Sequence, residues 1–168
     1  MEDRLPTAPT LILRVEPFDS PGATAMIEGA NRTNTALYGH ADQSPLDSEE
    51  FLPHRRGRFI VAYFNGTPIG CGGYRAHHDD ASGSTAEIKR MYVEPDARRQ
   101  GLARTILARL EADARSDGYH AVILDTGSKQ HAAHNLYENC GYTRTDGFGL
   151  YRDKPGNRAY LKTFTLPT

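Results

Sequence analysis

The pattern of apolar and polar positions predicts alternating strands and helices, as in a mixed α/β (α+β) domain. Apolar residues at positions 102, 106, 107, 110 and 114 share one helical face, and β-branched and aromatic runs between turn formers are typical of strands. The expected strands cover residues 11–15, 59–64, 68–76, 85–93, 121–125, 148–151 and 159–164. The expected helices cover residues 20–37, 48–52, 101–117 and 131–139. About seven strands and about four helices therefore fit one layered domain.

Local signals mark several boundaries of these elements. Ser20-Pro21 suits the start of a helix, because serine caps free amides and proline fits the first helical position. Asn65-Gly66 indicates a tight hairpin turn. Residues 1–9 are polar and contain prolines, so we expect a flexible tail followed by a single domain at 10–168.

Composition excludes several classes of protein. The 168 residues carry a formal net charge of −1, which gives no overall basic field for nucleic acid or membrane. Two cysteines, Cys71 and Cys140, do not make a disulfide framework. The longest apolar run, 59–64, is too short to cross a bilayer, and the N-terminus lacks a signal-peptide pattern. We therefore expect a cytoplasmic protein.

Residues 85–104 contain the strongest chemical signal. A strand to Val93 is followed by a loop with arginines and Gly101, and then by a helix. Free N–H groups at a helix N-terminus bind anions, and glycine allows close approach. The segment is neither a Walker loop nor a dinucleotide fingerprint. It predicts a phosphate cradle, although an ordinary strand–turn–helix with solvated arginines has the same local pattern.

The motif Arg98-x-x-Gly101-x-Ala103 resembles the pyrophosphate loop of the GNAT superfamily, the acetyl-CoA-dependent N-acetyltransferases. Two further segments resemble GNAT motifs: Ala86-Glu87-Ile88, and Ala133-x-x-Leu136-Tyr137-Glu138-x-x-Gly141-Tyr142. The resemblance covers residues 85–142. It implies a mostly antiparallel GNAT-like sheet with a central splay, in which the strand before the cradle and the strand after its helix diverge around the cofactor arm.

The resemblance also implies a set of acetyl-CoA contacts. The backbone at 91–93 would pair with the pantetheine arm, and the Val93 amide would face the thioester carbonyl. The amides and arginines of the loop would hold the pyrophosphate. Gln130 stands where the family often has Asn. The implied cofactor-binding residues are Met91, Tyr92, Val93, Arg98, Arg99, Gln100, Gly101, Leu102, Ala103, Arg104, Gln130 and Tyr137.

Two residues are implied in proton transfer. Glu87 matches a family base, and a partly desolvated carboxylate at the splay should have a raised pKa. The alternative is a strand glutamate paired with Lys89 or with an arginine on the next strand. Tyr137 matches the family tyrosine that approaches the CoA sulfur as a general acid. The alternative is a core tyrosine on a short helix.

The expected function is transfer of an acetyl group from acetyl-CoA to a primary amine, by direct transfer in a ternary complex. The acceptor pocket should involve residues 20–55 and 145–160, and the acidic stretch 42–50 either attracts a cationic amine or is a solvated loop. We expect a small-molecule or amino-acid acceptor. Two alternatives remain: a non-catalytic acetyl-CoA-binding module, and an acetyltransferase of a protein N-terminus or lysine. A homodimer also remains open.

Other constellations give weaker signals. The histidines at 77–78 and 131–134 do not have structural zinc spacing, so we expect no metal. Either cysteine could in principle carry the acetyl group as a nucleophile, but neither has a histidine base adjacent in sequence.

Overall fold

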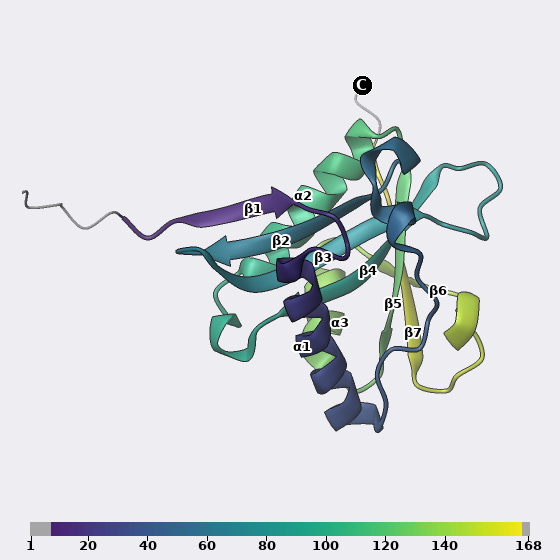
Figure 1. Cartoon of the computed structure of the whole chain (residues 1–168). Coiled ribbons are helices and arrows are strands. Elements are labelled where there is room, and N and C mark those ends of the chain that lie inside the picture. Colours follow the sequence, from purple (N-terminus) through teal and green to yellow (C-terminus); the bar gives the residue numbers. More distant parts are fainter. Residues whose placement is uncertain (1–7, 166–168) are drawn as a thin grey trace, which may run out of the picture.

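The computed structural model describes residues 8–165, and most of the expected N-terminal tail lies outside them. Helices cover both faces of one seven-stranded sheet (Figure 1). The strands are β1 (Leu11–Val15), β2 (Arg58–Phe64), β3 (Thr67–Ala76), β4 (Thr85–Val93), β5 (Ala121–Gly127), β6 (Thr143–Thr145) and β7 (Asn157–Thr163). The helices are α1 (Pro21–Tyr38), α2 (Leu102–Ser116) and α3 (His131–Asn139), and four 3₁₀ helices add short turns among these residues.

The strands follow the order β1-β2-β3-β4-β5-β7-β6. Among the described strands, only β4 and β5 run parallel, and the other neighbouring pairs are antiparallel. The prediction of a mixed, mostly antiparallel sheet is therefore confirmed. A parallel pair needs a crossover connection, and here α2 supplies it between β4 and β5.

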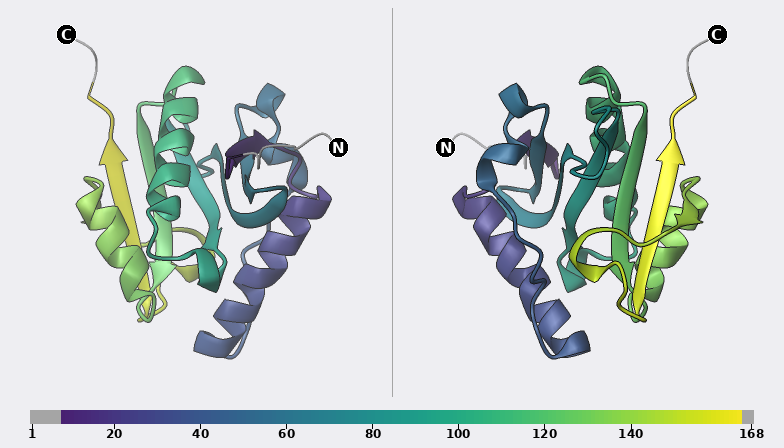
Figure 2. Two further views of the ribbon diagram at one scale, coloured as in Figure 1. Left: turned by 90° about the vertical axis from the view of Figure 1, so that its left-hand side faces the viewer. Right: turned by 90° about the vertical axis from the view of Figure 1, so that its right-hand side faces the viewer.

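Two apolar cores lie on opposite faces of the sheet, because alternate strand residues point to opposite sides. On one face, Ile106 and Leu110 of α2 pack with Ile60 and Ile88, and Tyr137 of α3 joins this core. The other core contains the buried face of α1 together with Phe59, Val61, Cys71 and Tyr92. Figure 1 shows α1 in front of the sheet with α2 and α3 behind, and Figure 2 shows α2 between α3 and α1.

The start of α1 confirms the predicted cap. Ser20 Oγ accepts a hydrogen bond from the Ala23 amide at 3.1 Å, and Pro21 is the first helical residue. Gly29 within the helix has a packing reason: a Cβ there would lie 2.6 Å from the Tyr92 ring. The glycine therefore lets α1 approach β4.

The expected helix at 48–52 is instead a 3₁₀ helix, η1 (Ser48–Phe51). Pro53 follows, and a proline restricts the preceding residue to extended conformations. Leu52 accordingly has φ −83° and ψ 147°, which ends the turn before a second 3₁₀ helix, η2 (Pro53–Arg55), begins. The described chain thus has three α-helices rather than about four.

The expected strand at 148–151 is wrong. Gly149 has a φ of +61°, which breaks an extended chain, and Gly149–Tyr151 form the 3₁₀ helix η4. The Phe148 ring lies edge-on to His77, with 4.9 Å between ring centroids. A short edge strand that was not predicted, β6, pairs with β7 and completes the set of seven strands. Its polar sequence, Thr-Arg-Thr, lacks the apolar alternation by which the other strands were recognised.

Candidate active site

The strands β4 and β5 pair only at one end. Their parallel register runs from Thr85↔Ala121 to Glu87↔Ile123, although β4 continues to Val93 and β5 to Gly127. Beyond Glu87 the two strands diverge, as Figure 1 shows. The predicted splay is present, and it leaves one edge of each strand without a neighbouring strand along the gap.

The amide of Val93 faces this gap. Val93 lies opposite Gly70 in the antiparallel pair of β3 and β4, and the next amide, Glu94 N, donates to Ile69 O at 2.9 Å. In such a ladder, successive amides point to opposite edges of the strand. The Val93 N–H therefore points away from β3, while the Val93 carbonyl accepts a hydrogen bond from Arg98 Nε at 2.9 Å.

A bulge in β4 interrupts the regular alternation of side chains at Arg90 and Met91. Arg90 has a φ of +58°, and the register shift places Arg90 and Met91 together opposite Gly72. The Met91 and Val93 side chains pack with the α2 core, whereas Tyr92 is buried beneath α1. These three expected cofactor residues can therefore offer mainly their backbone to a ligand in the gap.

The loop before α2 forms an open helix N-terminus. Arg99 and Gly101 both have positive φ values, 64° and 81°, and no atom lies within 4 Å of a Cβ built on Gly101. The first helical bond joins the Thr105 amide to Gly101 O. Among the described residues, the preceding three amides, those of residues 102–104, have no backbone acceptor. Three free N–H groups beside an open glycine match the predicted anion cradle.

The arginine side chains of the cradle differ in whether they already have a hydrogen-bond partner. Arg98 is held by its bond to Val93 O, and its guanidinium lies 5.8 Å from the centroid of the Tyr92 ring. Arg99, Gln100 and Arg104 are exposed at the loop and the first helical turn. Their side chains are free to reach an anion from solvent.

Glu87 lies at the last paired position of β4 and is 4% exposed. Its carboxylate contacts His77 Nδ1 at 3.2 Å, Lys89 Nζ at 3.3 Å and Arg75 Nη2 at 3.6 Å. Burial alone would raise its pKa, but the His77 hydrogen bond and the charges of Lys89 and Arg75 outweigh burial and lower the pKa. The expectation of a raised pKa is therefore wrong, and Glu87 pairs with Lys89 and Arg75; its role as a base stays a prediction.

Tyr137 on α3 is 5% exposed, and its ring contacts those of Tyr142 and Tyr160. Its hydroxyl has no hydrogen-bond partner among the described residues. Burial, followed by the nearby Asp125 and Cys140, raises the pKa of Tyr137. The hydroxyl therefore stays protonated at neutral pH and keeps its proton available for donation.

The C-terminal part of α1 closes one side of the gap. Gln130, at the start of α3, donates its amide to Asn34 Oδ1 at 3.4 Å, and the Lys129 amide donates to the Tyr38 hydroxyl at 3.2 Å. A Cβ on Gly127 would lie 2.0 Å from that hydroxyl, so glycine permits this approach. Gln130 thus lies beside the gap, but its amide is engaged with α1.

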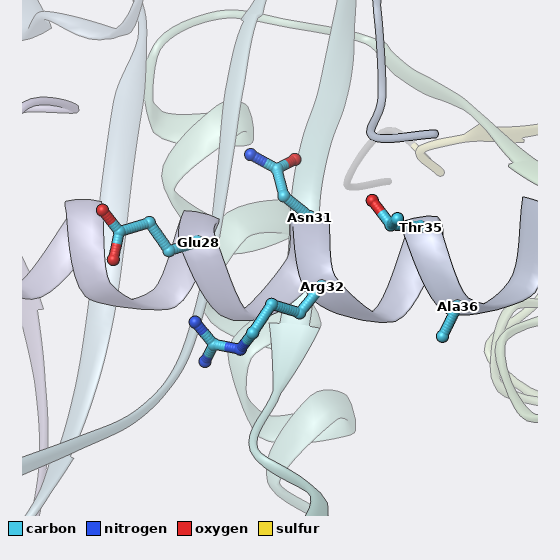
Figure 3. Close-up of a pocket in the computed structure, with 5 residues that line it drawn as sticks. All are labelled: Glu28, Asn31, Arg32, Thr35 and Ala36. Carbon is cyan, nitrogen blue, oxygen red and sulfur yellow. The ribbon is translucent and has the colours of Figure 1, made fainter. Parts of the chain in front are cut away.

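A separate pocket lies along α1 (Figure 3). It is lined by Glu28, Asn31, Arg32, Thr35 and Ala36, all from successive turns of this helix. No residue of β4 or β5 lines it. The splay between the strands, rather than this pocket, carries the chemical groups that the sequence predicted.

The acidic stretch 42–50 is partly neutralised by cations of the sheet. Asp42 forms an ion pair with Arg90, and Glu50 Oε2 lies 2.7 Å from Arg75 Nη1. Tyr151 donates to Asp42 Oδ1 at 3.1 Å, which brings the loop before β7 to the same place. These contacts join residues far apart in sequence, and no local motif signalled them.

Among the described residues, neither cysteine forms a hydrogen bond with a histidine base. Cys71 is fully buried and its Sγ donates to Arg90 O at 3.2 Å; burial raises the pKa of this thiol. Cys140 is partly buried and follows α3. Over residues 8–165, no group of three or more His, Cys, Asp or Glu side chains could hold a metal ion. In the same range, no helix is long and apolar enough to cross a membrane.

The sequence matches the model of the acetyltransferase (GNAT) family over residues 24–142. The chain belongs to the GNAT family. IAA acetyltransferase of Azospirillum brasilense is 39% identical over 130 residues, which cover 77% of this chain and 82% of that protein. N-acetylaspartate synthetase of Danio rerio is 31% identical over 105 residues, or 62% of this chain, but the match spans only 36% of that longer protein.

Solved structures share the fold of this chain. A proposed acyl-CoA N-acyltransferase from Klebsiella pneumoniae has a TM-score of 0.75 at 26% identity, covering 92% of this chain and 97% of that one. A GNAT acetyltransferase from Elizabethkingia anophelis, solved with acetyl-CoA bound, has a TM-score of 0.65 at 17% identity, covering 92% and 98%. The predicted GNAT fold is confirmed, and the family's acetyltransferase activity applies to this chain.

Proposed function

We propose that this chain transfers the acetyl group of acetyl-CoA to the primary amine of a small molecule or amino acid, directly, in a ternary complex. One observation carries the proposal: the gap between β4 and β5 has a free Val93 N–H on its edge and three free amides at its cradle. A thioester arm and a pyrophosphate need those two kinds of donor.

The cofactor residues would act mainly through the backbone. The amides of Leu102, Ala103 and Arg104 would bind the pyrophosphate, with the α2 dipole and the exposed Arg99 adding positive potential. The edge of β4 from 91 to 93 would hold the pantetheine arm. Arg98 would fix the loop by holding the Val93 carbonyl, which leaves the adjacent Val93 amide oriented toward the gap.

The chemistry follows from these placements. The neutral amine attacks the thioester carbon, and the Val93 N–H stabilises the oxyanion that forms. Collapse of the tetrahedral intermediate breaks the C–S bond, and Tyr137 donates a proton to the departing thiolate. Glu87 remains the residue proposed from the sequence for proton removal. Its lowered pKa keeps it ionised, but makes it a weak proton acceptor.

The acceptor class is supported by two relatives. Their names, IAA acetyltransferase and N-acetylaspartate synthetase, point to small acceptors. In this chain, α1 and the loop that is tied through Asp42 to Arg90 would border the acceptor side of the gap. With these relatives, we favour a small amine over a protein N-terminus or lysine. We also propose a cytoplasmic enzyme that needs neither metal nor nucleic acid, with monomer and homodimer both open.

Release of CoA thiol during incubation with acetyl-CoA and a panel of amines tests the proposal. The panel contains amino acids, aliphatic diamines, aromatic amines and lysine-containing peptides. Turnover of one of the small amines is the expected result. Tight acetyl-CoA binding without any turnover would favour the non-catalytic module, and turnover of peptides alone would move the acceptor to protein.

A further inference from the structure

The β5 edge of the gap carries a carboxylate that the sequence motifs did not single out. Asp125 is two residues past Ile123, the last β5 residue paired with β4. Because paired residues of parallel strands point to the same face, Asp125 shares the face of Glu87 and Lys89, opposite the buried Leu124. Asp125 therefore lies level with Lys89, at the point where the strands have begun to separate.

The surroundings of Asp125 differ from those of Glu87. Glu87 has three cationic or hydrogen-bonding partners within 3.6 Å. The Asp125 side chain forms no hydrogen bond or ion pair with any other described residue, although it is partly buried; its own backbone amide is its one hydrogen-bonding neighbour. A partly buried carboxylate without a counter-ion has a reduced tendency to ionise, because desolvation disfavours the charged form. One that faces the gap of an acyltransferase is placed to take a proton.

We propose that Asp125, rather than Glu87, is the catalytic base that removes the proton from the ammonium of the acceptor. This inference rests on the proposed acetyl-transfer function and assigns one of its steps. Glu87 then has a positioning role, since it fixes Lys89, Arg75 and His77 along one wall of the site.

The proton affinity of Asp125 suits this role. Burial raises its pKa to about 6; the Lys89 charge opposes this shift, and the charges of Glu87 and Asp42 add to it. The charges that act on it are those of Lys89 and Glu87 on β4 and Asp42 in the loop after α1, and Asp125 in turn acts on Tyr137 of α3, which packs in the core on the Leu124 face. A base is most effective when its pKa lies near the working pH. Asp125 meets this condition and Glu87 does not.

The proton balance is complete with the residues present. The ammonium gives one proton to the Asp125 carboxylate, and the resulting amine forms the C–N bond. When the C–S bond breaks, Tyr137 gives its proton to the sulfur and regains one from the amide nitrogen. Asp125 releases its proton to solvent. The products are the acetylated amine, CoA thiol and one proton.

Paired variants test the assignment. Asp125→Asn keeps the size of the side chain but removes the base, and Glu87→Gln is the matched control on the opposite strand. We expect Asp125→Asn to lower turnover on the order of 10²–10⁴-fold at neutral pH. It should also remove the acidic limb near pH 6 from the kcat/KM profile, and acetyl-CoA affinity should stay near normal. Glu87→Gln should keep that limb, and Asp125→Glu should restore part of the turnover.

A second readout does not depend on activity. Carbon-13 NMR of the aspartate carboxyls should show one that titrates near pH 6 in wild type and disappears in Asp125→Asn. Titration of Asp125 near pH 4, or an intact acidic limb in Asp125→Asn, would overturn the assignment. Loss of the limb in Glu87→Gln alone would return the role to Glu87. If wild type acetylates no amine, the proposed function fails and this assignment falls with it.

Discussion

Asp42 and Arg90 form an ion pair that joins the loop after α1 to the bulge of β4. Arg90 is 9% exposed and has a positive φ, so the pair stabilises an unusual backbone conformation on the strand that would hold the cofactor. Tyr151 bonds to the same carboxylate and adds a third segment. This ion pair thus helps to join the acceptor side of the gap to the cofactor side.

Breaking this pair should destabilise the protein. Asp42→Asn would leave the Arg90 charge buried without a carboxylate, and we expect a loss of about 3 kcal/mol in unfolding free energy. The control is Asp79→Asn, which breaks the Arg152–Asp79 pair, whose side chains are 57% and 50% exposed. That change should cost no more than about 0.5 kcal/mol. Urea unfolding at pH 7 measures both, and equal effects would contradict the prediction.

The loss of stability caused by Asp42→Asn should become smaller as the pH falls. Although burial by itself would raise the pKa of Asp42, Arg90 and Ser44 outweigh it and lower the pKa below 3.8. A carboxylate with a lowered folded-state pKa stabilises the protein above its unfolded value and loses this contribution as the pH falls through the folded value. The difference between wild type and Asp42→Asn should therefore be full above about pH 5. It should shrink toward pH 3.

The cradle can be tested with two matched glycines. Gly101 and Gly66 have φ values of 81° and 83°, and no atom lies within 4 Å of a Cβ built on either. Replacing each with glutamate introduces similar backbone strain, but only Gly101→Glu places a carboxylate beside the free amides of 102–104. Calorimetry should show acetyl-CoA binding weakened at least about tenfold, or about 1.4 kcal/mol, in Gly101→Glu. Gly66→Glu should bind normally; equal weakening would refute the cradle.

Tyr137→Phe should separate activity from stability. Its hydroxyl has no hydrogen-bond partner among the described residues, so removal should leave the melting temperature unchanged or slightly higher. Turnover should fall, since the thiolate would leave unprotonated. The control is Tyr160→Phe, which loses the 3.1 Å bond to Glu138 and should cost about 1 kcal/mol with little change in turnover. Full activity in Tyr137→Phe would make Tyr137 a core residue only.

Glu87→Gln and Asp125→Asn should shift the melting temperature in opposite directions. Glu87 has a lowered pKa, so it stabilises the fold above its unfolded value near 4.5, and Glu87→Gln should lower the melting temperature at pH 8. Asp125 has a raised pKa, so its ionisation costs stability above about pH 6, and Asp125→Asn should raise the melting temperature at pH 8. Both differences should diminish toward pH 4. Melting curves of both variants and wild type from pH 4 to pH 8 check this. Shifts of the same sign at pH 8 would contradict a lowered pKa for Glu87 and a raised pKa for Asp125.

The sequence by itself determined the parts of the site that depend on neighbouring residues. The open N-terminus of α2 follows from Gly101, a left-handed position before an amphipathic helix, and the helix start at Ser20 follows from its cap. The position of Tyr137 was readable from a short motif on α3. Two predicted elements differ from the structure because of one residue each. Pro53 shortens the predicted helix at 48–52, and Gly149 interrupts the predicted strand at 148–151. Torsion preferences and caps act within a few residues, so the sequence encodes them directly.

Only the tertiary structure decided the charges around the gap. Glu87 was expected to have a raised pKa, but the pairing of β3 with β4 places Arg75 and His77 beside it. Asp125 lacks a partner because β5 diverges from β4 just beyond Ile123. A pKa depends on charges within a few ångströms, and strand register brings those charges together from distant positions. The sequence contains both carboxylates, but the fold determines which of them has the higher proton affinity.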